Sequence, residues 1–176
     1  MTYFSIHNHS SYSNALLGFA DSINDIKKSV DYAIDLGLSG YVLTDHEGLS
    51  GHAQLLHYRD KLETDGKIKD FTIGLGNEIY LVEELIQDQK FYHHLLIAKD
   101  EIGHKILRIL SSQAWKNSFW SRGLQRTPIT RDQVKEIMER ENGKGHLISS
   151  TACLGSVEAQ AFLNIKASED VPFGEE

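Results

Sequence analysis

The most constraining feature of this sequence is a regular alternation between short apolar runs and longer segments of helical spacing. Apolar runs of strand length, such as 41–43 and 95–97, alternate with segments in which apolar residues recur every three or four positions. Strands separated by helices are typical of an α/β fold with a mostly parallel sheet. In such folds the reactive side chains gather at the C-terminal ends of the strands.

The expected elements follow one another without a linker or an internal repeat, so 1–176 is expected to form a single domain. Asp21 or Ser22 is expected to cap the first long helix, and Thr130 a later one. We expect strands over 3–9, 40–44, 71–81, 92–98 and 145–150, and helices over 22–36, 52–63, 101–115, 130–141 and 157–165.

Composition excludes several classes of protein. Apolar residues make up 40% of the chain and charged residues 24%, with only 2 prolines, so disorder is not expected. No apolar run reaches the 18 or so residues of a membrane span, and the N-terminus does not resemble a secretory signal. A single cysteine excludes an internal disulfide scaffold and is typical of a cytoplasmic protein.

The net charge constrains the partners. Subtracting 25 acidic from 18 basic residues leaves −7, which is unfavourable for holding nucleic acid or phosphate over the whole surface. A phosphate-bearing substrate would therefore need a local source of positive charge, which a bound metal ion can supply. Nine histidines in a chain of this length are consistent with such an ion.

Candidate metal ligands recur where successive strands are expected to end. Alternate residues of a strand point to the same side, so His7 and His9 are expected to face one ion or two neighbouring ions. Imidazole and carboxylate ligands suit Zn, Mn or Fe, and a thiolate shifts the preference toward Zn. The residues at the strand ends are His7, His9, Asp45, His46, Glu78, His93, His94 and Cys153.

Each of these residues has a simpler interpretation when taken alone. A histidine at a strand end is usually a polar surface residue, and Cys153 by itself is more often a small buried apolar residue. Asp45 could bond the nearby backbone in a turn. His52, His57 and His104 lie in helical patterns and are interpreted as surface or packing residues. Recurrence at five places on one edge of the sheet favours the metal site.

These residues lie in segments that resemble the polymerase and histidinol phosphatase (PHP) family. His7-Asn-His-Ser-Ser-Tyr-Ser13, Thr44-Asp-His-Glu47 and Gly76-Asn-Glu-Ile-Tyr80 resemble three of its motifs in order. The segments 92–99, 110–115 and 149–155 resemble its bacterial replicative polymerase branch. From about 3 to 157, the chain is most similar to the N-terminal PHP domain of bacterial or phage DNA polymerase III alpha subunits.

The resemblance implies a distorted seven-stranded (β/α) barrel with a metal-lined pocket at its mouth. It implies two or three divalent ions (Zn, Mn or Fe), with His7, His9, His46 and Glu78 at the centre of catalysis. His94 is preferred over His93 because the histidine of the family directly precedes an apolar strand. The implied ligands are His7, His9, Asp21, His46, Glu78, His94 and Cys153.

The resemblance also implies an activity, which is metal-dependent hydrolysis of phosphodiesters at DNA 3′ ends during replication (3′–5′ exonuclease). Arg122 and Arg126, before Pro128, are expected to clamp a phosphate, with solvated loop arginines as the alternative. One other hypothesis is a catalytically inactive module that supports a polymerase. Another is a histidinol-phosphatase-like enzyme, against which the polymerase-like segments count.

One departure from the family pattern affects the expected fold. The late Asp-x-His motif of the family does not occur after Cys153, so we expect a front portion of the barrel that is incomplete at its C-terminus. No polymerase activity is expected from this chain alone. An incomplete barrel exposes an unpaired strand edge, which predicts self-association or docking onto a polymerase core or a complementary chain.

Overall fold

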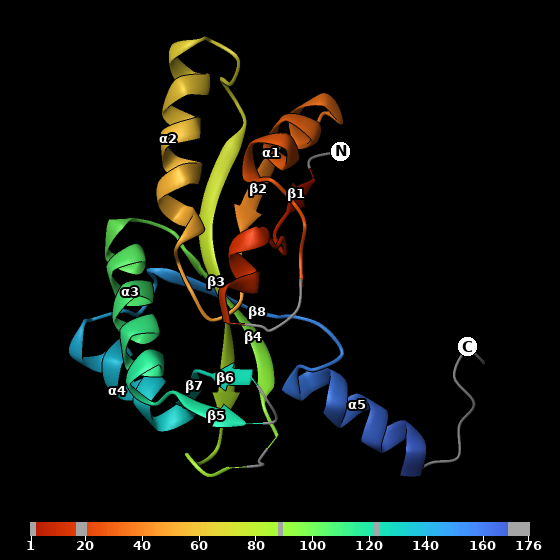
Figure 1. The fold of residues 1–176 in the computed structure, drawn as a ribbon, viewed down its shortest axis with the longest axis vertical. Helices are drawn as coiled ribbons and strands as arrows, with labels where there is room; N and C mark the ends of the chain where they lie inside the picture. Colours follow the sequence, from red (N-terminus) through yellow and green to blue (C-terminus); the bar gives the residue numbers. More distant parts are fainter. Residues whose placement is uncertain (1–2, 17–20, 88–89, 122–123, 169–176) are drawn as a thin grey trace.

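The computed structural model describes residues 3–16, 21–87, 90–121 and 124–168 (Figure 1). Among them are eight strands, five α-helices and one 3₁₀-helix. The strands are β1 (Phe4–Ser5), β2 (Gly40–Leu43), β3 (Thr72–Val82), β4 (Tyr92–Ala98), β5 (Phe119–Ser121), β6 (Leu124–Arg126), β7 (Pro128–Thr130) and β8 (Leu147–Thr151). The helices are η1 (Ser11–Leu16), α1 (Ile26–Asp35), α2 (Gly51–Thr64), α3 (Glu101–Lys116), α4 (Arg131–Arg140) and α5 (Val157–Ser168).

The predicted α/β class is confirmed. Six strands form one curled sheet in the order β1-β2-β3-β4-β8, with β7 paired to β3. β1, β2, β3 and β7 run parallel, whereas β4 is antiparallel to both β3 and β8. The described residues between β3 and β4 form no helix, and the connection is short, so the two strands pair antiparallel, because a parallel pair needs a long crossover. The sheet is therefore mostly parallel, as expected, with β4 reversed.

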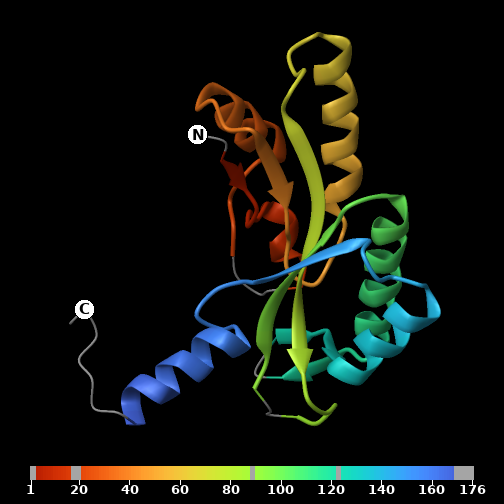
Figure 2. The ribbon, with the colours of Figure 1, turned by 180° about the vertical axis from the view of Figure 1, so that it is seen from behind.

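Helices cover the sheet over two separate apolar cores. α1 and α2 pack over β2 and the first half of β3, and Leu43 and Leu55 are fully buried there. α3 and α4 pack over the second half of β3, β4 and β7, and Ile106 and Leu107 are fully buried there. Burying each such side chain contributes roughly 1.5–3 kcal/mol. In both views α5 extends away from these cores, beyond the end of β8 (Figure 2).

Local capping signals identify one helix start correctly and misplace another. Thr130 caps α4 and forms a reciprocal capping box with Gln133, as such a sequence predicts. The N-cap of α1 is Asp25, whose side chain accepts a hydrogen bond from Lys28 N, and not Asp21 or Ser22. Ser22 has a different role, because its hydroxyl donates to the carbonyl oxygen of His9 at 3.0 Å.

The first strand is shorter than the predicted 3–9, since β1 ends at Ser5. The chain continues beside the end of β2, where Asn8 N donates to Thr44 Oγ1 at 3.0 Å and Asn8 Nδ2 to Val42 O at 2.9 Å. The strands β5, β6 and β7 were not predicted, because three residues each are too few for a period to show. Of the described helices, none combines the length and apolar character that crossing a membrane requires.

Candidate metal centre

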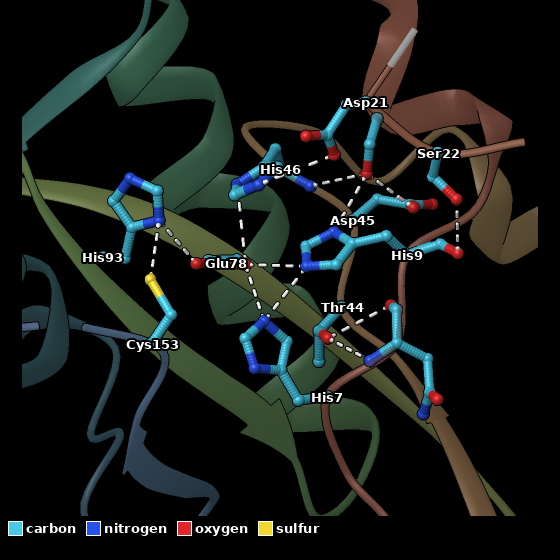
Figure 3. Close-up of polar contacts among 12 residues, drawn as sticks. His7, His9, Asp21, Ser22, Thr44, Asp45, His46, Glu78, His93 and Cys153 are labelled. Carbon is cyan, nitrogen blue, oxygen red and sulfur yellow. Dashed lines mark hydrogen bonds and ion pairs between the residues drawn. The ribbon is translucent and has the colours of Figure 1, made fainter. Parts of the chain in front are cut away.

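The carboxylate of Glu78 is the centre of a histidine cluster (Figure 3). Its side chain is only 1% exposed, and its Oε2 lies 2.8 Å from His7 Nε2 and 2.9 Å from His9 Nε2. The other oxygen, Oε1, lies 2.8 Å from His93 Nδ1. His46 Nδ1 is 3.5 Å from Oε2. One buried carboxylate therefore faces four imidazole rings that come from separate parts of the sequence.

The sheet brings these residues to one edge. His7 and His9 follow β1, and His46 follows β2 and bridges to Glu78 of β3. His93 is the second residue of the reversed strand β4. Because β4 runs opposite to β3, its first residues lie near the C-terminal end of β3. His7, His9 and His46 lie just beyond the C-terminal ends of β1 and β2, as expected, whereas Glu78 lies within β3.

A network around Asp45 orients His9. The buried Asp45 carboxylate accepts hydrogen bonds from Ser10 N at 2.6 Å, Ser10 Oγ at 2.8 Å and Ser13 Oγ at 2.9 Å. Because the only hydrogen of the Ser13 hydroxyl is donated to Asp45, Ser13 Oγ accepts from His46 N and from His9 Nδ1, both at 3.1 Å. A neutral His9 therefore carries its proton on Nδ1 and directs an unprotonated Nε2 toward the cluster.

The electrostatics of the cluster favour positive charge at its centre. Burial alone would raise the pKa of the Glu78 carboxyl, but hydrogen bonds from His9, His93 and His7 outweigh it. The pKa of Glu78 therefore lies well below its usual range. Burial lowers the pKa of His9, yet the hydrogen bond and charge of Glu78 overcome burial and raise it. Burial lowers the pKa of His46 to about 4, so this ring is neutral.

Two further predicted ligands flank the cluster at opposite ends. Asp21 Oδ2 lies 3.7 Å from His46 Nε2, and Cys153 Sγ lies 3.6 Å from His93 Nδ1 (Figure 3). Among the described residues, donor atoms within 4.8 Å of one another form three sets that share members along this line. They are His7 with His9 and Glu78, His9 with Asp21 and His46, and His46 with Glu78 and His93.

The structure corrects one predicted residue, because it brings His93 and not His94 to the cluster. In the β3–β4 pairing His93 lies opposite Tyr80, which shares a face of β3 with Glu78, whereas His94 lies opposite Ile79 on the other face. His94 Nε2 instead lies 2.7 Å from Ser149 Oγ. The choice between two adjacent histidines requires the register in which β4 pairs with β3, and strand boundaries expected from the sequence do not give this register.

The two predicted phosphate-binding arginines have different outcomes. Arg122 lies outside the described residues. The guanidinium carbon of Arg126 lies 5.6 Å from the ring centroid of Tyr80 and 5.3 Å from that of Phe91. Tyr80 in turn packs on His93, with 4.8 Å between ring centroids. Arg126 is therefore next to the residues that border the cluster, and its contact with a phosphate remains a prediction.

The donors fit a transition-metal site. His46 Nδ1 is buried without a hydrogen-bond partner, which is a cost that coordination of a cation would remove. Imidazole nitrogens, a buried carboxylate and a nearby thiol are the ligands that Zn, Mn and Fe accept in proteins. The orientation of His9 through Ser13 and Asp45 resembles the carboxylate-linked support that metal-bound histidines usually have.

Comparison with protein families shows to which family this chain belongs. The family model described as "PHP domain" matches residues 5–171, which is nearly the whole chain. The chain therefore belongs to the PHP domain family, and the predicted family membership is confirmed.

Similar curated proteins are polymerases. The chain is 39% identical over 173 residues to "Probable DNA polymerase YorL" of Bacillus subtilis, covering 93% of this chain and 13% of that protein. It is 31% identical over 179 residues to the DNA polymerase III subunit alpha of Chlamydia trachomatis, covering 97% of this chain and 12% of that protein. The chain thus spans about an eighth of the length of these relatives.

One solved structure also matches. It is a "putative metal-dependent phosphoesterase" from Bifidobacterium adolescentis, 19% identical, with a TM-score of 0.41 over 64% of this chain and 34% of that chain. At this level of similarity the match carries no argument about the site. The metal-binding interpretation therefore depends on the geometry around Glu78.

Proposed function

We propose that this chain is the metal-dependent phosphoesterase domain of a protein like the DNA polymerase III alpha subunit, and that it hydrolyses phosphodiesters at DNA 3′ ends. The observation that carries the proposal is the buried Glu78 carboxylate with four imidazoles around it. Two or three divalent ions (Zn, Mn or Fe) are proposed as cofactors. Similarity to polymerases supports DNA as the substrate.

The proposed ligands follow from the contacts. Glu78 would be the central ligand, with His7, His9, His46 and His93 around it, and Asp21 and Cys153 would contribute at the two ends. When bound, divalent ions supply hydroxide near neutral pH and offset the charge of a phosphodiester.

The remaining residues position this centre. Ser13 and Asp45 keep His9 in the tautomer that presents Nε2. Arg126 is proposed to hold a phosphate oxygen at the rim, where its guanidinium would add local positive charge to an acidic chain. Ser13 and Asp45 thus serve orientation, and Arg126 serves binding, since the net charge of −7 works against an approaching DNA strand.

Metal analysis and two substrates test the proposal. We expect more than one tightly bound divalent ion per chain, release of nucleotides from the 3′ end of single-stranded DNA, and little release of phosphate from histidinol phosphate. His9→Ala should abolish nucleotide release, whereas His57→Ala, which alters an exposed histidine of α2, should leave it unchanged.

Other outcomes identify the competing hypotheses. Less than one tightly bound ion per chain would indicate a catalytically inactive module that supports a polymerase. Faster hydrolysis of histidinol phosphate than of DNA would indicate a small-molecule phosphatase. Nucleotide release that survives His9→Ala would point to a contaminating nuclease and would remove the support for the proposed activity.

A further inference from the structure

A cavity of about 320 Å³ adjoins the histidine cluster, and nothing above assigns it a role. Its walls come from η1, from the segment after β2 and from α3. Among its lining residues are Tyr12, His46, Glu47, Ser50, Ser111 and Trp115. Because His46 belongs both to this lining and to the cluster, a ligand with its phosphate at the cluster would have its next chemical group at the cavity.

Two aromatic side chains give the cavity an exposed apolar surface. Tyr12 is 39% exposed and Trp115 is 40% exposed, so each ring presents a large apolar area to solvent. The indole of Trp115 is held in place, since its Nε1 donates to the carbonyl oxygen of Glu47 at 3.1 Å. Exposed aromatic rings, such as these two, are the usual surface on which single-stranded nucleic acids stack their bases.

Glu47 connects the cavity to the histidine cluster through its backbone hydrogen bonds. Glu47 N donates to the carbonyl oxygen of Glu78 at 3.1 Å, while Glu47 O receives the hydrogen bond from Trp115. Glu47 has φ of 58°, a left-handed conformation that L residues adopt rarely, and these two bonds hold it there. The position of the indole is thus linked to the strand that carries Glu78.

The size of the cavity limits the ligand. Its volume is near the lower end of the usual range for small-molecule sites, so it suits a single nucleoside better than a longer segment. Ser50 and Ser111 contribute hydroxyl groups, which either donate or accept and therefore do not select one base edge. Aromatic stacking does not select a base either, because every base has a π-face.

We propose that this cavity receives the 3′-terminal base of single-stranded DNA, stacked against Tyr12 and Trp115, while the adjoining phosphate faces the histidine cluster. The inference rests on the proposed function for its choice of DNA. Its test avoids catalysis, because base binding can be measured with all metal removed by a chelator.

Tryptophan fluorescence provides the measurement. The chain has two tryptophans, and Trp120→Phe, which alters an exposed residue of β5, leaves Trp115 as the only one. In chelator, a thymidine tetranucleotide should quench Trp115 fluorescence. The same oligonucleotide with an abasic 3′-terminal residue should bind at least about fivefold more weakly, the lower limit for losing one stacked base.

A matched pair of variants separates stacking from folding. In the Trp120→Phe background, Tyr12→Leu should weaken binding at least about fivefold, whereas Tyr12→Phe, which keeps the ring, should bind like the parent. Circular dichroism would verify that both variants fold. Absence of quenching at millimolar oligonucleotide, or equal binding of the abasic strand, would overturn the inference. Either result would leave the proposed metal-dependent hydrolysis intact.

Discussion

Two histidine groups lie along the same strand, β3, and they differ in the group at their centre. At Glu78, four imidazoles surround a buried carboxylate. At Gly76, two residues earlier, His52 Nε2 lies 2.8 Å from the carbonyl oxygen and His52 Nδ1 lies 3.2 Å from His104 Nε2. Because a carbonyl oxygen only accepts, His52 donates from Nε2 and accepts from His104 at Nδ1.

The difference shows why counting histidines is a poor guide to a metal site. Both ring nitrogens of His52 have hydrogen-bond partners, namely the carbonyl oxygen of Gly76 and the ring of His104. Burial lowers the pKa of His52 to about 4, so this ring is neutral and has a structural role. Around Glu78 the carboxylate instead raises the pKa of His9 against the effect of burial. A buried carboxylate among imidazoles attracts a cation, whereas a backbone carbonyl orients a ring. The interpretation of His52 as a packing residue agrees with this contact.

The largest effect is expected from removing the central carboxylate. Glu78→Gln keeps the side-chain shape but removes the charge, so affinity for a divalent ion should fall on the order of a thousandfold, or about 4 kcal/mol. Isothermal titration with Mn²⁺ or Zn²⁺ would measure it. His52→Gln is the control and should change metal affinity less than threefold. Equal losses in the two variants would break the distinction between the two histidine groups.

A smaller effect is expected on stability in acid. The His52 pKa is about 4 in the folded protein and about 6.5 in the unfolded chain, so between these values the unfolded chain binds more protons. Stability from this residue is complete above about pH 6.5 and is lost as the pH falls toward 4. The loss is at most about 3.4 kcal/mol, because the pKa values differ by about 2.5 units at 1.36 kcal/mol per unit.

Urea unfolding at several pH values would measure this dependence. His52→Gln should have a lower free energy of unfolding at pH 7 and should lose less of it between pH 6.5 and 4 than the parent chain. Identical slopes for the two proteins would show that His52 is not held neutral by its surroundings.

The smallest effect separates two adjacent residues of β4. His93→Ala should weaken metal binding about 10–100-fold, the range typical of losing a supporting or peripheral ligand contact, whereas His94→Ala should change it less than twofold. Both variants remove one imidazole from the same strand, so they are matched in composition. A larger loss in His94→Ala than in His93→Ala would contradict the face assignment made from the strand pairing.

Most of the site could be predicted because its residues are marked by local sequence. His7, His9, His46 and Glu78 follow or lie in strands that hydrophobic patterning identifies, and the parallel sheet then brings them together. Metal binding, the number and identity of the ions, and the roles of Arg122 and Arg126 remain predictions. The orientation of His9 was missed, because the Ser13 hydroxyl that it contacts is itself oriented by a hydrogen bond to Asp45, 32 residues further along the chain.

The α/β class, most strand and helix positions, the capping of α4 and the residue types of the cluster could be predicted from the chain alone, because these depend on periodicity and residue type over a few neighbouring positions. Two features required the folded arrangement: His93 and not His94 faces Glu78, and Tyr12 and Trp115 share a cavity with His46. Strand register and helix placement are set by packing between distant segments, and a shift of one residue in a strand reverses the face of every side chain.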